Sequence, residues 1–115
     1  MAFQGSCHCG AVKFTVEGDL PKQAMSCNCS ICRRKGMLMG FFPAAKVKVE
    51  GEDKLQAYQF NKHRLSHWFC KTCGIHTFGG GVGPDGTDTR AINLRCVPDV
   101  DLDALTIQKF DGASA

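Results

Sequence analysis

The residues of this chain best suited to chemistry are its cysteines, and seven of the eight fall into three short clusters. The clusters are Cys7-His8-Cys9, Cys27-Asn28-Cys29-Ser30-Ile31-Cys32 and Cys70-Lys71-Thr72-Cys73, which leave Cys96 alone. Thiolates this close along a chain converge on a soft or borderline cation. Zinc takes four ligands in a structural site and three, with one open position, in a catalytic site. Seven ligands therefore fit two zinc ions, one enclosed and one facing solvent.

The segment Cys70-x-x-Cys73-Gly74, called the knuckle below, is a strong signal for half of a tetrahedral zinc site. Gly74 can adopt the positive φ that turns backbone amides toward sulfur. The natural second half is Cys7-x-Cys9-Gly10, because it also ends in glycine and lies at the start of a strand. We therefore predict a structural zinc that clips two ends of a sheet together and closes a long loop.

The third cluster differs because Cys27, Cys29 and Cys32 come from one short segment and can cover only one side of a metal. An open zinc position holds water or a substrate thiol and lowers its pKa. Three thiolates on Zn²⁺ leave a net charge of −1. This charge makes the zinc a weaker Lewis acid and better suited to binding sulfur. The basic triplet 33–35, which begins with Arg33 and Arg34, follows directly and could offset this charge or bind a small anionic group.

Spacing alone leaves other arrangements open. A tetrahedral site could also be built from Cys27, Cys29, Cys70 and Cys73. We prefer the first division because residues of one short segment reach one metal with least backbone strain. A redox thiol pair, a single four-cysteine site with three spare thiols, and disulfides in an oxidising compartment are further alternatives. Cys96 is expected to pack as a small apolar residue on a strand.

The four histidines, His8, His63, His67 and His76, each have an ordinary structural explanation. His8 stands between two predicted ligands and should point away from their metal. His67 and His76 flank the knuckle and are expected near a metal or a pocket wall. For His76, a hydrogen-bonded strand position is favoured over a general acid or base role.

Length and charge limit the remaining possibilities. A chain of 115 residues is expected to form one domain, over 1–112, with a tail at 113–115. A net charge of +3 is too small for a nucleic-acid footprint. The first ten residues show no secretory leader, and no stretch approaches the roughly 20 apolar residues of a membrane span. We therefore expect a cytoplasmic protein without nucleic-acid or membrane partners, in which this cysteine spacing favours metal; its oligomeric state stays open.

The elements that must position these residues are mainly strands. Alternating apolar residues predict six strands, at 11–16, 47–49, 55–60, 64–69, 91–96 and 105–110. We expect Leu105 and Ile107 to face inward in the last of these. One helical turn is expected at 30–35, with Ser30 as its N-cap. The glycine-rich segment 79–89 and the end 112–115 are expected to be loose, the former as a plain surface connection.

Four ordered motifs span nearly the whole chain. They are Gly5-x-Cys7-x-Cys9-Gly10-x-Val12-x-Phe14, Cys27-x-Cys29-Ser30-x-Cys32-Arg33-Arg34, Phe69-Cys70-x-x-Cys73-Gly74 and Asn93-Leu94-Arg95. Together they resemble the glutathione-dependent formaldehyde-activating (GFA) family, which also includes centromere protein V. The segments 100–103 and 110–112 look like the C-terminal part of the same family.

The resemblance implies a mainly β fold, a β-tent of short antiparallel sheets stapled by a structural zinc. The ligands it implies are Cys7, Cys9, Cys70 and Cys73 for that zinc, and Cys27, Cys29 and Cys32 for a second, more labile zinc. It also implies a carbon–sulfur lyase. In the named enzyme, glutathione approaches the second metal and condenses with formaldehyde to S-hydroxymethylglutathione.

We therefore predict a zinc-dependent carbon–sulfur lyase that acts on an adduct of glutathione or another small thiol. Arg33 or Arg34 would contact a substrate carboxylate, and the ligands of the open site would be catalytic. The alternative is a non-catalytic zinc-binding module that docks a protein partner or carries zinc. A weaker alternative is a thiol redox protein that uses Cys96 and resembles the β-tent methionine sulfoxide reductases.

Overall fold

The computed structural model describes residues 1–59, 66–82 and 85–114. Its strands are β1 (Ala2–Ser6), β2 (Lys13–Glu17), β3 (Gln23–Cys27), β4 (Met39–Pro43), β5 (Val47–Glu50), β6 (Leu55–Tyr58), β7 (Ser66–Cys70), β8 (His76–Val82), β9 (Asp88–Asn93) and β10 (Thr106–Phe110). The helices are α1 (Ser30–Lys35) and the short 3₁₀ helices η1 (Ala44–Lys46), η2 (Glu52–Lys54), η3 (Leu94–Cys96), η4 (Leu102–Ala104) and η5 (Gly112–Ser114). The prediction of a mainly β protein is confirmed.

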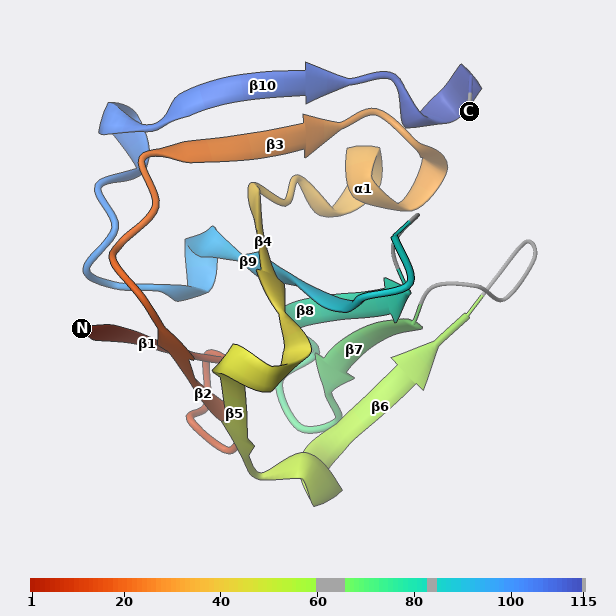
Figure 1. Ribbon diagram of the computed structural model, residues 1–115. Helices are drawn as coiled ribbons and strands as arrows, with labels where there is room; N and C mark the ends of the chain where they lie inside the picture. Colours follow the sequence, from red (N-terminus) through yellow and green to blue (C-terminus); the bar gives the residue numbers. More distant parts are fainter. Residues whose placement is uncertain (60–65, 83–84, 115) are drawn as a thin grey trace.

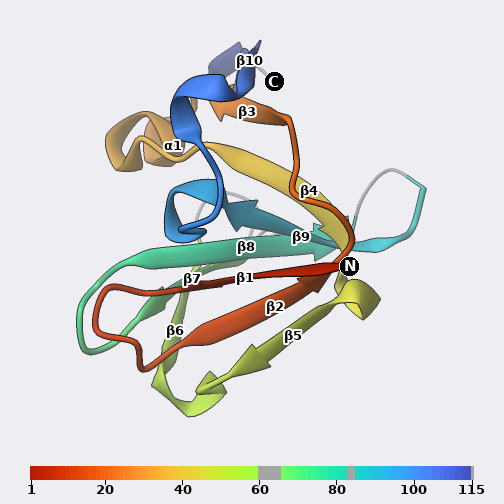
Figure 2. The ribbon, with the colours of Figure 1, turned by 90° about the vertical axis from the view of Figure 1, so that its left-hand side faces the viewer.

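The strands form two sheets. One has three strands in the order β1-β2-β5, and the other has seven in the order β10-β3-β4-β9-β8-β7-β6. Figure 2 shows the small sheet at one end of the molecule, with β3 and β10 at the opposite end. Most neighbouring strands are antiparallel, as expected, but β3 and β10 are parallel and lie side by side in Figure 1.

The core fills the space between the two sheets. Phe14 and Val16 of β2 are 1% and 0% exposed, as their alternation predicts, and they belong to the same apolar cluster as Ile92 and Phe78 of the large sheet. The rings of Phe14 and Phe78 meet edge to face with centroids 6.5 Å apart. Such pairs add to the free energy gained from burial alone. The two sheets are therefore joined by aromatic packing as well as by the chain.

A sharp corner leads from the small sheet into the large one. β5 ends at Glu50, and Gly51 follows with a φ of 84° before η2 and β6 begin. A Cβ at position 51 would collide with the carbonyl oxygen of Ala11, because the two backbones approach closely there. The amide of Lys71 then donates to the carbonyl of Lys54 at 2.8 Å, so β7 ends beside this corner. This places the knuckle next to the turn between β1 and β2.

The structure has strands that the pattern missed. β1, β3, β4 and β8 were not among the six expected strands. The expected strand at 91–96 ends at Asn93 and continues as η3, and Ile107 is 39% exposed on the edge strand β10 rather than turned inward. These short strands carry few alternating apolar residues, so their pairing depends on their neighbours. Phe60 and residues 61–65, including His63, lie outside the described residues.

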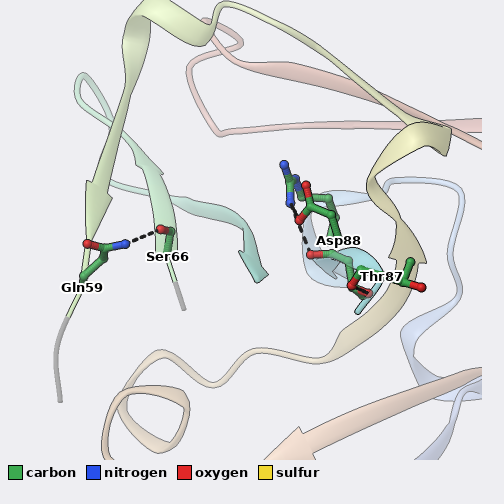
Figure 3. Close-up of polar contacts among 6 residues, drawn as sticks. Gln59, Ser66, Thr87 and Asp88 are labelled. Carbon is green, nitrogen blue, oxygen red and sulfur yellow. Dashed lines mark hydrogen bonds and ion pairs between the residues drawn. The ribbon is translucent and has the colours of Figure 1, made fainter. Parts of the chain in front are cut away.

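The glycine run was wrongly expected to be loose. Gly79, Gly80 and Gly81 lie inside β8, where they pair with β9, and the first two are buried. A Cβ at Gly80 would come within 2.7 Å of the side chains of Trp68 and Arg90. Arg90 lies 5.2 Å from the Trp68 ring centroid, so the glycine makes room for a cation–π contact. The same guanidinium pairs with a carboxylate oxygen of Asp88 at 2.7 Å at the start of β9 (Figure 3).

The start of α1 and the C-terminal segment also differ from expectation. The N-cap of α1 is Cys29, not Ser30, and it makes no side-chain capping bond. The C-terminal segment 112–114 is a 3₁₀ helix rather than a loose end, and the boundary at 112/113 stays a prediction. Within the described residues, no helix is long and apolar enough to cross a membrane.

The buried face of β2 provides a test of the fold. Phe14→Ala is expected to lower the free energy of unfolding by about 3–5 kcal/mol, because a large side chain between the sheets is replaced by a cavity. Lys13→Ala, on the exposed face of the same strand, should change it by less than about 0.5 kcal/mol. Chemical denaturation of both variants with zinc in the buffer measures this, and equal losses would contradict the described register.

Candidate functional site

The first cysteine cluster joins the β1–β2 turn to the knuckle. The four Sγ atoms all lie within 4.8 Å of one another, and they belong to Cys7, Cys9, Cys70 and Cys73. Cys9 Sγ lies 3.6 Å from both Cys7 Sγ and Cys70 Sγ. A zinc tetrahedron with Zn–S bonds of about 2.3 Å has edges of about 3.8 Å, so this spacing fits the metal. The alternative set, which paired the knuckle with Cys27 and Cys29, is wrong.

Backbone amides point at these sulfurs from both sides. The amide of Val12 donates to Cys7 Sγ at 3.4 Å, and the amide of Thr72 donates to Cys70 Sγ at 3.4 Å. Gly10 and Gly74 close the two turns with φ of 82° and 78°, and the positive φ of Gly74 confirms the prediction made for it. Hydrogen bonds to a thiolate favour its charged form, which is the form that binds a metal.

The crowded sulfurs do not all ionise together. The amide of Cys73 lowers the pKa of Cys70, and although burial raises the pKa of Cys73, the amide of Cys9 and neighbouring groups lower it to about 6. For Cys9, the Ala11 amide lowers the pKa, but desolvation and the adjacent sulfurs outweigh it and raise the pKa to about 11. A divalent cation removes this conflict because each ligand then binds as thiolate. The donor set therefore fits a zinc ion.

The second cluster lies where β3, α1 and β10 meet. Cys27, Cys29 and Cys32 have Sγ atoms within 4.8 Å of one another, so the structure keeps the contiguous triplet together. Cys27 ends β3, Cys29 caps α1, and Cys32 lies in the first turn of that helix, where it is buried. Burial, followed by the charge and sulfur of Cys29, raises the pKa of Cys32. Burial also opposes ionisation of Cys29, but the Cys32 amide and nearby groups lower its pKa overall.

All eight cysteines lie within the described residues, and all are free thiols. Disulfide pairing, one of the open alternatives, is therefore not the arrangement found. The two clusters could each bind a metal ion, one with four sulfur ligands and one with three.

The second cluster opens onto a cavity of about 570 Å³, whereas the four cysteines of the first cluster do not line it. This volume is typical of a small-molecule site. The lining comes from several strands and is mainly apolar. Besides the three cysteines it comprises Met25, Ile31, Met37, Met39, Phe41, Ser66, His67, His76, Gly79, Gly80, Gly81, Val82, Asp85, Thr89, Ala91 and Phe110. At its edge Gln59 Nε2 donates to Ser66 Oγ at 2.8 Å (Figure 3).

The basic triplet divides in the structure. Arg33 and Arg34 are exposed in the last turn of α1 and are not among the lining residues, and Arg34 donates to the Ser30 carbonyl at 2.8 Å. Lys35 points elsewhere: its Nζ lies 3.5 Å from His76 Nδ1 and 5.6 Å from the Phe69 ring centroid. The substrate-binding role of the two arginines stays a prediction that their position does not favour.

The described histidines and Cys96 have structural surroundings. His8 is exposed, whereas His67 and His76 are buried in the cavity wall, as expected. Burial, with help from Lys35 and His67, lowers the pKa of His76 to about 3, so its imidazole is neutral at physiological pH. Cys96 lies in η3 rather than on a strand, partly buried against the core, and burial raises its pKa to about 11.

Sequence reasoning missed the residues that shape the second site. The methionines Met25, Met37 and Met39 line the cavity, and the pair at 37–39 was the only signal of an adaptable apolar wall. Gly112 was also missed. A Cβ there would lie 2.5 Å from Cys27 Sγ and 3.2 Å from Cys29 Cβ, so the end of the chain covers the cluster through a glycine.

Other contacts hold this end of the chain in place. The amide of Asn28 donates to the Phe110 carbonyl at 3.2 Å, and its side chain donates to Asp111 Oδ1 at 3.0 Å. On the other side of α1, Arg95 Nε donates to the carbonyl of Gly36 at 2.9 Å. The Asn93-Leu94-Arg95 motif therefore supports the helix that carries Cys32.

These features define a mainly β protein with two cysteine clusters that could bind metal ions. The chain belongs to the glutathione-dependent formaldehyde-activating enzyme family, whose profile matches residues 2–100. It is 34% identical over 107 residues to a Halomonas elongata protein provisionally named a glutathione-dependent formaldehyde-activating enzyme, covering 74% of this chain and 68% of that protein. The crystal structure of a Rhodobacter sphaeroides protein is similar, with a TM-score of 0.80, 32% identity, and coverage of 93% and 99%.

The different number of sulfur ligands in the two clusters predicts different metal retention. Purified protein is expected to contain two zinc ions per chain, and a mild chelator should remove one while the circular dichroism spectrum stays native. Cys73→Ser should lower the unfolding midpoint sharply, because it leaves three thiols of the enclosing set without their metal. Cys29→Ser should keep the fold and lose only the chelator-sensitive ion. Loss of both ions in one step would contradict this division.

The close approach of Gly112 provides a second test. Gly112→Ala is expected to weaken metal binding at the three-cysteine cluster, because its Cβ would overlap Cys27 Sγ unless the chain end shifts. Zinc titration with a colorimetric competitor should show at least tenfold weaker binding at one site and no change at the other. Lys109→Ala, an exposed change on the neighbouring strand, is the control. Unchanged affinity in the glycine variant would show that this contact is not needed.

Proposed function

We propose that this protein is a zinc-dependent carbon–sulfur lyase that acts on the adduct of a small thiol and an aldehyde, with glutathione and formaldehyde as the reaction for which the family is named. The observation that carries the proposal is the three-cysteine cluster in the wall of a cavity of about 570 Å³. Three sulfurs leave one position of a tetrahedral zinc open. The enclosed four-cysteine cluster is then the structural site.

Zinc bound at the open site would supply the positive charge that keeps a substrate thiol deprotonated at neutral pH. Cys27, Cys29 and Cys32 would hold that ion in the wall of the cavity. In the condensation the thiol sulfur bonds to the carbonyl carbon, the carbon–oxygen double bond becomes single, and the proton lost by the thiol ends on the oxygen. The reverse reaction breaks the same carbon–sulfur bond. The apolar wall excludes water and holds both reactants near each other.

His76 is suited to bind the reacting oxygen rather than to act as a base. Its pKa of about 3 keeps the ring neutral. The ammonium of Lys35 has only donors, so His76 Nδ1, 3.5 Å away, accepts, which leaves the ring proton on Nε2. From the cavity wall, this N–H can donate to an aldehyde or hydroxyl oxygen.

A non-catalytic binding module is the second candidate. It is favoured by three apolar side chains at the cavity that stay exposed, Phe41, Val82 and Phe110, at 49%, 67% and 47%. Such groups also mark surfaces that bind proteins. The redox alternative has less support, because a thiol with a pKa of about 11, as in Cys96, is not a thiolate at neutral pH.

Exchange spectroscopy tests the proposal. NMR measures the rate at which formaldehyde, glutathione and S-hydroxymethylglutathione interconvert, and wild-type protein is expected to raise it above the rate in buffer. Cys32→Ser should return it to the buffer rate, because a ligand of the open site is lost. Cys96→Ser is the matched cysteine control and should keep the wild-type rate. Equal rates for wild type and Cys32→Ser would remove glutathione adducts as substrates; two chelator-resistant zinc ions would then favour the binding module.

A further inference from the structure

We propose that the cavity selects thiol adducts with an uncharged, apolar body and discriminates against anionic thiols such as glutathione. This inference rests on the proposed function and names the substrate class of the same site. It depends on the wall of the cavity rather than on the metal ligands.

The first observation is the chemistry of that wall. The side chains beside the three cysteines include Met25, Ile31, Met37, Met39 and Phe41, none of which can pair with a carboxylate. Glutathione carries two carboxylates and an ammonium group besides its thiol. Bringing an ion into an apolar space costs several kcal/mol unless a partner group compensates. An apolar body would instead gain from contact with this wall.

The second observation is charge. Among the described residues that line the cavity, Asp85 carries the only carboxylate, and there is no Lys or Arg. Asp85 stays ionised, because the amide of Thr87 donates to its Oδ1 at 3.0 Å and lowers its pKa. Zinc with three thiolates adds a further net charge of −1. Both groups repel an anionic substrate and leave a neutral one unaffected.

Among the described residues, the nearby cations are engaged by other groups or turned away. Lys35 is not a lining residue, and its Nζ lies 3.5 Å from His76 Nδ1 and 5.6 Å from the Phe69 ring centroid. Arg34 is exposed and donates to the Ser30 carbonyl, and Arg33 is exposed in the same turn. Arg90 pairs with Asp88 and stacks on Trp68. In the described structure, none of these three arginines lines the cavity, so none stands ready to bind a carboxylate inside it.

The third observation is the room that small residues provide. Gly79 pairs with Ala91 across β8 and β9, and both line the cavity. Neither residue extends a large side chain into this part of the cavity of about 570 Å³. The exposed rings of Phe41 and Phe110 stand beside this space, where an apolar substrate would cover them. A bulky apolar group therefore has both a place and a favourable surface.

A matched pair of thiols tests the inference with the zinc-loaded protein. N-acetylcysteine and its benzylamide have the same thiol environment, but the first is anionic and the second is neutral and carries an aromatic ring. Their exchange with formaldehyde is measured by NMR beside that of glutathione. The benzylamide is expected to show a kcat/KM at least tenfold above both anionic thiols.

Two variants separate the effect of the cavity from that of overall charge. Asp85→Asn should raise kcat/KM for N-acetylcysteine and glutathione by about threefold or more and leave the benzylamide unchanged. Asp99→Asn removes the same charge at an exposed position that does not line the cavity and should change neither. Equal increases in both variants would overturn the role assigned to the cavity charge.

The outcomes distinguish this inference from the proposed function. Glutathione or N-acetylcysteine turned over as well as the benzylamide, or better, would overturn the preference and leave the lyase proposal standing. Rates equal to the buffer for all three thiols would overturn both. Acceleration of all three thiols, with the benzylamide at least tenfold ahead, supports both. Acceleration of the benzylamide alone supports the preference and a lyase of neutral thiol adducts, and it removes glutathione as a substrate.

Discussion

The structure depends on one constraint, the convergence of four sulfurs from two hairpin ends. The β1–β2 turn belongs to the small sheet and the knuckle to the large one, and the corner at Gly51 brings them together. Sulfurs 3.6 Å apart, with amides directed at them, oppose one another's ionisation, and a bound cation would relieve this conflict. A chain of 115 residues has a limited core, so a metal bound at this junction would add a link between the two sheets.

The same fold produces a second site with different properties, because its three sulfurs come from one segment. β3 delivers Cys27, and the short helix α1 carries Cys32, so the ligands approach from one side. The parallel strand β10 then leads the chain end over the cluster at Gly112, and Arg95 holds the far end of α1. The side of the cluster that no ligand covers faces the cavity. The positions where the strands end thus give one cluster four ligands from two hairpin ends and give the other three ligands beside the cavity.

The sequence predicted correctly how the cysteines divide into two clusters, because the spacing of cysteines along the chain limits which of them can share a metal site. It also predicted the buried face of β2 and the positive φ of Gly74. The sequence-based predictions failed where packing between residues far apart in the chain determines the structure. The glycines at 79–81 resemble a loop, yet Trp68 and Arg90 fill the space beside them and make them part of a central strand. The prediction of Ser30 as the N-cap was wrong, because α1 begins at Ser30 and its N-cap is Cys29.

The two arginines show why a residue in a family motif need not contact the substrate. Arg33 and Arg34 adjoin the last ligand in sequence, but the helical rotation of about 100° per residue turns them to solvent while Cys32 points inward. Other residues that line the cavity, such as Gly79 and Ala91, come from strands far away in the chain and belong to none of the four motifs. Family membership therefore accounts for the cysteine clusters, whereas the residues that line the rest of the cavity come from other parts of the chain. Among the described residues, that lining is mainly apolar and carries one carboxylate, and for this reason the preference we propose is for a neutral partner.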